Sequence, residues 1–159
     1  MLHHSFVRAT LAAAALLATL PAWALHPGAD GLQWGDAPPV FNKGAKIAVL
    51  QGDPGKPGPF VARLSAPSGY KVMPHWHSQV ENVTVLSGTL MVGMGDKFDT
   101  KVMKTFKAGA FGSIPAQTHH YALFKGATVI QIHGEGPFDL TYVDPADDPQ
   151  KKMADAKKP

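Results

Sequence analysis

Two histidines and a glutamate lie within a short stretch of the sequence. His75 and His77 are separated by one residue, and Glu81 follows four residues after His77. On a β-strand, residues two apart project from the same face, so both imidazoles can reach one point while Trp76 points the other way. A turn at residues 78–79 would place Glu81 on the next strand, facing the same cavity. Burying these three polar groups without a partner would be costly, and a divalent cation compensates all three.

A histidine doublet, His119 and His120, offers a third imidazole further along the chain. Adjacent residues of a strand face opposite sides, so only one of the two can join the first pair. An isolated pair such as His75 and His77 is more often solvated or hydrogen-bonded than metal-bound. The acidic residue and the distant third histidine favour a metal site instead.

The segments that must position these side chains are short and are separated by turn residues. Regularly spaced short strands favour a sandwich or a barrel over an α/β fold. The first two segments are predicted to form a hairpin around a loop rich in Gly and Pro. The predicted strands are 45–50, 60–64, 70–77, 81–86, 89–94, 102–106, 111–114, 121–124, 128–133 and 140–143.

The composition excludes several classes of protein. A length of 159 residues fits one domain. The net charge of +3, from 15 basic and 12 acidic residues, is too slight and too scattered for nucleic-acid binding. The chain has no cysteine, which removes disulfides, thiolate nucleophiles and cysteine-type zinc sites. Any metal ion must therefore be held by nitrogen and oxygen.

The N-terminus has the pattern of a cleaved signal peptide over residues 1–24. Arg8 precedes an apolar run over residues 9–20, and Ala22-Trp23-Ala24 has the small-x-small form of a cleavage site. The alternative, a membrane anchor, would need about 20 apolar residues. We therefore expect an exported protein, periplasmic or secreted, without stable membrane insertion. An irregular lead-in over 25–43 should precede the barrel over 44–144, and 145–159 should form a tail or a short helix capped by Asp147 or Asp148.

The spacing of these residues resembles the two motifs of the cupin superfamily. The first motif, G-x5-H-x-H-x3/4-E-x6-G, is matched at every fixed position by Gly69, His75, His77, Glu81 and Gly88. The second, G-x5-P-x-G-x2-H-x3-N, is matched by Gly109, Pro115 and His120. The chain is also similar to the cupin domains of zinc-binding anti-sigma factors, in His75-Trp76-His77 and in residues 83–88.

Two positions depart from the second motif. Gln117 stands where the family usually has glycine, so either the turn differs or Gln117 bears a steric cost. Phe124 stands where asparagine is usual, which should affect packing beside the site rather than ligation. The spacing of the motif selects His120 over His119 as the third ligand. His133, a lone histidine at the end of a strand, should have a surface or supporting role.

The resemblance implies an all-β, single-domain fold, the cupin double-stranded β-helix or jelly-roll barrel, with one divalent transition-metal ion inside. His75, His77, Glu81 and His120 would ligate that ion and leave room for water or substrate. Imidazole and carboxylate ligands suit Mn, Fe, Zn, Ni or Cu better than Ca or Mg. The carboxylate favours Mn or Fe, whereas the Irving–Williams order favours Cu or Zn.

Two classes of function fit the resemblance. The first is a metal-dependent oxidoreductase of the dioxygenase type, acting on a small oxygen-rich substrate, with Glu81 as a ligand or as a catalytic general base. The second is a non-catalytic module that binds a metal or a small ligand, as a sensor does. A sugar isomerase or epimerase on the same scaffold is a third reading that no residue supports.

The expected partners are few. The partner is a small molecule rather than a nucleic acid or a membrane, and the resemblance also favours a homodimer formed through outer strands. Some apolar residues are candidates for the wall of the barrel interior, although ordinary core packing is the more frequent role for each. They are Phe60, Met73, Met91, Met103, Phe111 and Phe124, with Val83 and Val85 beside the site.

Overall fold

The computed structural model describes residues 31–155, with side chains up to residue 153. Apart from two short helical segments, the regular structure is β-strand. The strands are β1 (Gly35–Asp36), β2 (Lys46–Gln51), β3 (Gly58–Ala66), β4 (Lys71–Trp76), β5 (Glu81–Ser87), β6 (Thr89–Met94), β7 (Lys104–Lys107), β8 (Phe111–Ile114), β9 (His120–Phe124), β10 (Thr128–Gly136) and β11 (Thr141–Tyr142). The helical segments are η1 (Pro145–Asp147) and α1 (Pro149–Asp155). Each predicted strand overlaps one strand from β2 to β11, and the predicted signal peptide lies outside the described residues.

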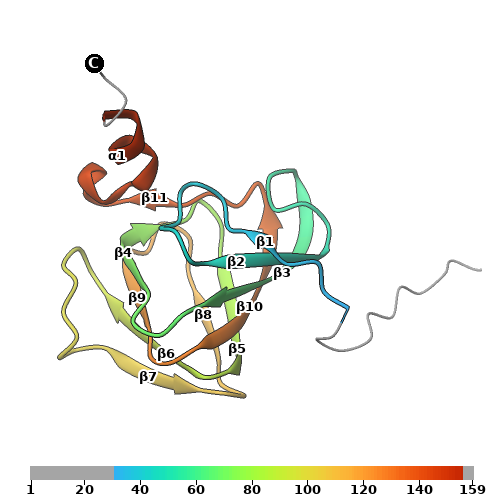
Figure 1. Ribbon diagram of the computed structural model, residues 1–159, viewed down its shortest axis with the longest axis horizontal. Coiled ribbons are helices and arrows are strands. Elements are labelled where there is room, and N and C mark those ends of the chain that lie inside the picture. Colours follow the sequence, from blue (N-terminus) through green and yellow to red (C-terminus); the bar gives the residue numbers. More distant parts are fainter. Residues whose placement is uncertain (1–30, 156–159) are drawn as a thin grey trace, which may run out of the picture.

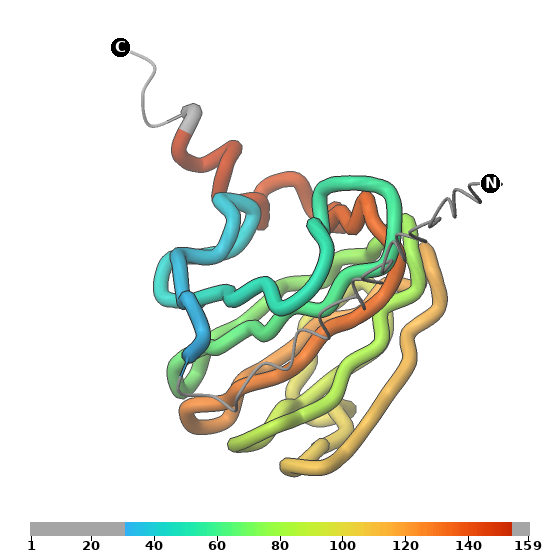
Figure 2. Tube along the Cα trace, turned by 90° about the vertical axis from the view of Figure 1, so that its right-hand side faces the viewer, coloured from blue at the N-terminus to red at the C-terminus, as the bar shows by residue number. Residues whose placement is uncertain are grey.

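The strands form two antiparallel sheets that enclose the core (Figures 1 and 2). One sheet has the order β1-β2-β3-β10-β5-β8, and the other has the order β11-β4-β9-β6-β7. The chain passes repeatedly from one sheet to the other, as between β3, β4, β5 and β6. This is the jelly-roll arrangement that the sequence predicts, and β2 and β3 form the expected hairpin.

Alternation along the strands explains which residues form the core. In β3, the buried residues Phe60, Ala62, Leu64 and Ala66 alternate with residues that face outward. Side chains of this kind from both sheets meet in one apolar cluster that includes Val85, Leu90, Phe124 and Ile130. The cluster holds the sheets together and leaves one end of the interior to polar residues.

Gly88, the last residue of the first motif, makes the tight turn between β5 and β6. Its φ is +75°, a left-handed conformation that side chains rarely adopt. A Cβ atom there would lie 2.4 Å from the carbonyl oxygen of Ala127. The turn therefore requires glycine for two reasons, its conformation and the close approach of a neighbouring chain segment.

The lead-in is tied to the barrel by two tyrosines. The hydroxyl of Tyr70 donates a hydrogen bond to the carbonyl oxygen of Asn42 at 2.7 Å. The hydroxyl of Tyr142, in β11, donates to the carbonyl oxygen of Val40 at 2.9 Å. These contacts hold the residues on both sides of Phe41, whose side chain packs against the core.

The C-terminal segment leaves the barrel through β11 and η1 into α1. The side chain of Asp148 accepts a hydrogen bond from the backbone N–H of Gln150 at 2.9 Å, which caps the start of α1 before Pro149. Among residues 31–155, no helix has the length and apolar character needed to cross a lipid bilayer.

Candidate metal centre

The fold brings His75, His77 and His120 together at one end of the barrel interior. His75 lies in β4, His77 follows directly after that strand, and His120 opens β9, where it pairs with His75 across the sheet. One ring nitrogen from each histidine lies within 4.8 Å of the other two. The three residues are only 4%, 4% and 3% exposed. This is the spacing and burial that a shared cation requires.

Each of the three imidazoles is oriented by a backbone carbonyl group. The Nδ1 atoms of His75, His77 and His120 lie 2.7, 2.5 and 2.9 Å from the carbonyl oxygens of Met73, Asp139 and Thr118. A carbonyl oxygen can only accept, so each Nδ1 carries a proton and donates it. Each Nε2 is then free to offer a lone pair. Metal-binding histidines are commonly held in this way.

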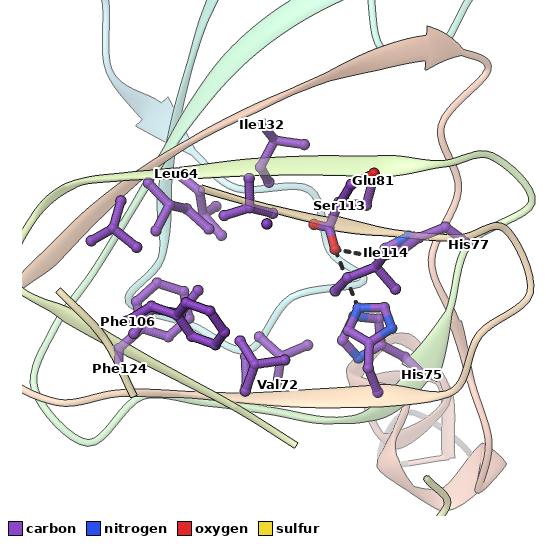
Figure 3. Close-up of a pocket in the computed structure, with 18 of the residues that line it drawn as sticks. Leu64, Val72, His75, His77, Glu81, Phe106, Ser113, Ile114, Phe124 and Ile132 are labelled. Carbon is purple, nitrogen blue, oxygen red and sulfur yellow. Dashed lines mark ion pairs between the residues drawn. The ribbon is translucent and has the colours of Figure 1, made fainter. Parts of the chain in front are cut away.

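Glu81, the first residue of β5, faces the same point (Figure 3). Its Oε2 atom lies 3.2 Å from Nε2 of His120 and 3.6 Å from Nε2 of His77. Burial acts to raise the pKa of this carboxyl, but the hydrogen bond with His120 and the positive charge of the neighbouring imidazoles in their protonated form outweigh burial and lower its pKa. Glu81 is therefore an ionised ligand candidate.

The polar atoms of this cluster fit a cation better than they fit one another. Nε2 of His77 is buried and has no hydrogen-bond partner among the described residues. A carboxylate oxygen and the lone pair of an imidazole repel each other unless a positive charge lies between them. A metal ion bound by the three Nε2 atoms and Glu81 would supply that charge and would partner the orphaned atom of His77.

Burial in the pocket favours the neutral form of His75 and of His77. Burial, reinforced by the neighbouring His120 and His77, lowers the pKa of His75 to about 3. Burial likewise lowers the pKa of His77. Neutral imidazole is the form that binds a metal ion, so these side chains need not release a second proton to do so.

Burial shows which histidine of the doublet, His119 or His120, faces the barrel interior. Nδ1 of His119 lies 2.6 Å from Oδ1 of Asp96 in a partly exposed pair, outside the cluster. His120 enters the interior, as the motif spacing predicts. His133, in β10, also lies outside the cluster, with its ring stacked near Phe111.

The two departures from the second motif have clear structural results. Gln117 has a φ of +59°, so the turn keeps the left-handed conformation for which glycine is usual. Its backbone N–H donates to the carbonyl oxygen of His77 at 2.8 Å, which joins this turn to the segment that carries His75 and His77. Phe124 is buried and packs edge-on against Tyr70, as expected for a packing residue.

Asp139 supports the centre in a way that the sequence analysis missed. Its carbonyl oxygen accepts from His77, and its carboxylate accepts from the backbone N–H and the hydroxyl of Ser78 at 2.7 and 2.8 Å. Burial acts to raise the pKa of Asp139, but the hydrogen bonds from Ser78 lower it. The residue is about sixty positions away from both partners, so no local motif could have revealed it.

A cavity of about 150 Å³ extends from the histidines into the barrel (Figure 3). Val83, Val85, Phe111 and Phe124 line it as predicted. Four candidates are absent from its wall, namely Phe60, Met73, Met91 and Met103. The lining includes three aromatic residues that were not predicted, Phe41, Phe106 and Phe138.

Strand alternation and packing account for two of these absences. Met91 lies between Leu90 and Val92, both of which face the cavity, so its own side chain faces the other way. Phe60 is buried behind the wall, where its ring contacts Phe138 at a centroid distance of 5.3 Å.

Comparison with known proteins places the fold. No family model matches the sequence, and no curated protein sequence matches it. Among solved structures, the polyketide cyclase RemF from Streptomyces resistomycificus superposes with a TM-score of 0.66 at 13% identity, covering 83% of this chain and 94% of its own. A proposed acetylacetone dioxygenase from Methylibium petroleiphilum gives 0.60 at 20% identity, covering 88% and 99%.

A third structure carries the family in its name. An RmlC-like cupin from Shewanella frigidimarina superposes with a TM-score of 0.55 at 16% identity, covering 72% of this chain and 91% of its own. Its likeness agrees with the two sequence motifs and with the order of the strands. The chain has the single-domain jelly-roll fold of the cupin superfamily.

Proposed function

We propose that this protein binds one divalent transition-metal ion through His75, His77, His120 and Glu81. The observation that carries the proposal is the set of three Nδ1–H groups committed to backbone carbonyls. With the proton on Nδ1, the neutral form of each imidazole has its lone pair on Nε2, and the three Nε2 atoms and the carboxylate of Glu81 face a common point. The oxygen and nitrogen donors favour Mn or Fe, with Zn, Ni or Cu as alternatives.

We propose further that the bound ion acts on a small molecule in the adjoining cavity, in an oxidoreductase reaction of the dioxygenase type. The ion would supply Lewis acidity and a binding site for substrate and O₂. The protein would hold the substrate against the cluster and exclude water through the apolar walls. Glu81 is the one carboxylate lining the cavity in the described chain, and it can accept a proton from a substrate that reaches its Oε2 atom.

The metal site is tested by elemental analysis of protein purified without chelators. We expect about one first-row transition ion per chain, and loss of that ion when His77→Ala and His120→Ala are combined. His133→Ala and His119→Ala are matched controls, because both residues are histidines outside the cluster. Wild-type protein that stays metal-free after reconstitution would rule out the site.

A non-catalytic role as a metal- or ligand-binding module is the second candidate. One observation favours it: apart from the four proposed ligands, no titratable side chain lines the cavity within residues 31–153. Oxygen uptake by the Mn, Fe, Ni and Cu forms, with diketone, flavonol and 2-oxoacid substrates, distinguishes the two roles. Consumption of O₂ by any form supports the enzyme, and no consumption by every form supports the module.

Export of the protein is part of the proposal and rests on the sequence of residues 1–24 alone. N-terminal sequencing of the protein from its native host would test it, with Leu25 expected as the first residue. A mature chain that still begins at Met1 would contradict export by this route. The homodimer expected from the resemblance likewise stays a prediction.

A further inference from the structure

We propose that the cavity binds a compact molecule whose oxygen atoms are confined to one edge, with hydrocarbon over the rest of its surface. In this proposal, Phe41 limits the length of the molecule that the cavity can hold. This inference rests on the metal site proposed above and narrows the oxygen-rich substrate expected from the sequence.

The polar groups of the cavity are gathered at one end. His75, His77, His120 and Glu81 form that end, and Ser113 is the one other polar side chain among the described residues that line the wall. The remaining lining residues are aliphatic, aromatic or glycine, apart from the thioether Met94. Figure 3 shows Leu64, Phe106 and Phe124 at the end away from the histidines.

This distribution selects against ligands that are polar throughout. Within the described residues, the lining includes no lysine or arginine that could pair with a carboxylate or a phosphate. Nor does the apolar part offer amide groups to bind the hydroxyls of a sugar. Each polar atom of a ligand placed there would lose its water without gaining a partner. Only the edge beside the cluster can accept oxygen atoms.

The volume limits the ligand to a small molecule. An apolar cavity of about 150 Å³ holds a molecule of the size of benzene. Among the apolar lining residues, Met94 and Phe111 are the most exposed, each at 58%, and they mark the mouth. Met94 is the last residue of β6, and Phe111 is the first residue of β8. Strands β7, which pairs with β6, and β8 are edge strands of the two sheets, so the mouth lies at these edges.

Phe41 closes the opposite side. The carbonyl groups of its two neighbours, Val40 and Asn42, are held by Tyr142 of β11 and by Tyr70, which directly precedes β4. Strands β11 and β4 form the other edge of their sheet, away from β7. Because the lead-in belongs to neither sheet at this point, the size of the side chain at position 41 can change without altering strand pairing. Phe41 is therefore placed to set the depth of the cavity.

The test uses two isosteric chelators and the zinc-loaded protein, because Zn²⁺ has no redox chemistry and binding can be measured without turnover. The probes are 2,4-pentanedione and malonate, which have the same number of heavy atoms and the same spacing of oxygens. In malonate, oxygen atoms replace both methyl groups. Their affinities are measured by calorimetry for the protein and for free Zn²⁺ in the same buffer.

The measured quantity is the ratio of the affinity for 2,4-pentanedione to that for malonate. We expect this ratio to be at least about tenfold higher for the zinc-loaded protein than for free Zn²⁺, because the outer oxygens of malonate would face hydrocarbon. An unchanged or reversed preference, with zinc bound, would overturn this inference and leave the metal site standing. Failure of the protein to bind zinc at all would overturn both.

The role of Phe41 is tested with a longer probe, 1-phenylbutane-1,3-dione. In Phe41→Ala, and to a smaller extent in Phe41→Leu, its affinity relative to that of 2,4-pentanedione should rise about tenfold, as the cavity lengthens. Phe98→Ala is the matched control, because Phe98 packs on Tyr121 and does not line the cavity. An unchanged ratio in both Phe41 variants, each retaining zinc, would overturn the assignment.

Discussion

The contact between Asp139 and Ser78 should control metal affinity without contributing a ligand. Replacing Asp139 with alanine removes an acceptor for two hydrogen bonds, from the backbone N–H and the hydroxyl of Ser78. The backbone carbonyl that holds His77 stays in the chain, but it loses the anchor that fixes its position. The change therefore loosens the orientation of His77 while leaving all four proposed ligands present.

The expected magnitudes follow from these contacts. A hydrogen bond contributes about 0.5–1.5 kcal/mol, so losing two should lower the free energy of unfolding of the metal-free protein by about 1–3 kcal/mol. Loss of a group that orients a metal ligand commonly weakens metal affinity about 10- to 100-fold. We expect Asp139→Ala to lose stability and metal affinity within these two ranges. Asp139→Asn should lose less of both, because it keeps an acceptor oxygen.

The assay combines urea unfolding of the metal-free protein with competition for Zn²⁺ against a chelator of known affinity. Asp148→Ala is the matched control, because Asp148 also accepts from a nearby backbone N–H, that of Gln150, at the start of α1. That variant should lose stability and keep its zinc affinity. Equal zinc affinities in wild type and Asp139→Ala, or equal losses in both variants, would refute the reasoning.

Three further predictions concern stability. Because the pKa of His75 is about 3 in the fold and 6.5 in the unfolded chain, its contribution is complete above pH 6.5 and is lost as the pH falls towards 3. Urea unfolding of the metal-free protein should show a loss of about 2 kcal/mol between pH 7 and pH 5, and constant stability would contradict this. Gln117→Gly should raise the free energy of unfolding by about 0.5–1 kcal/mol, because glycine removes the cost of a left-handed side chain and adds a smaller entropic one. A lower free energy of unfolding would count against strain at this turn. Gly88→Ala should cost at least about 2 kcal/mol, whereas Gly69→Ala, at a similar φ but with open space around the Cβ, should cost only about 1–2 kcal/mol. Equal thermal shifts in the two alanine variants would show that the close contact at Gly88 does not matter.

The sequence predicts the elements of the centre because their signals are local. The two-residue spacing of His75 and His77, the turn before Glu81 and the glycines of the motifs are all readable within a few positions. The choice between His119 and His120 needed the motif spacing, because alternation alone says only that the two face opposite sides. The structure shows His120 buried and His119 paired with Asp96.

The parts that sequence reasoning missed depend on contacts between distant segments. Asp139 reaches the centre through the return of the chain between β10 and β11, and Phe41 reaches the cavity through a lead-in without regular pattern. The methionine candidates lie outside the cavity wall for a different reason. Apolar character predicts burial, but only strand parity decides whether a side chain such as Met91 faces inward.

The three acceptors that orient the histidines are main-chain oxygens, and this has a consequence for how the centre withstands mutation. Substituting Met73 or Thr118 changes a side chain but leaves its carbonyl group in the peptide bond. The positions of the backbone carbonyl groups thus determine which ring nitrogen of each imidazole carries the proton. A centre of this kind tolerates extensive drift in the neighbouring residue types, provided that the strands keep their course.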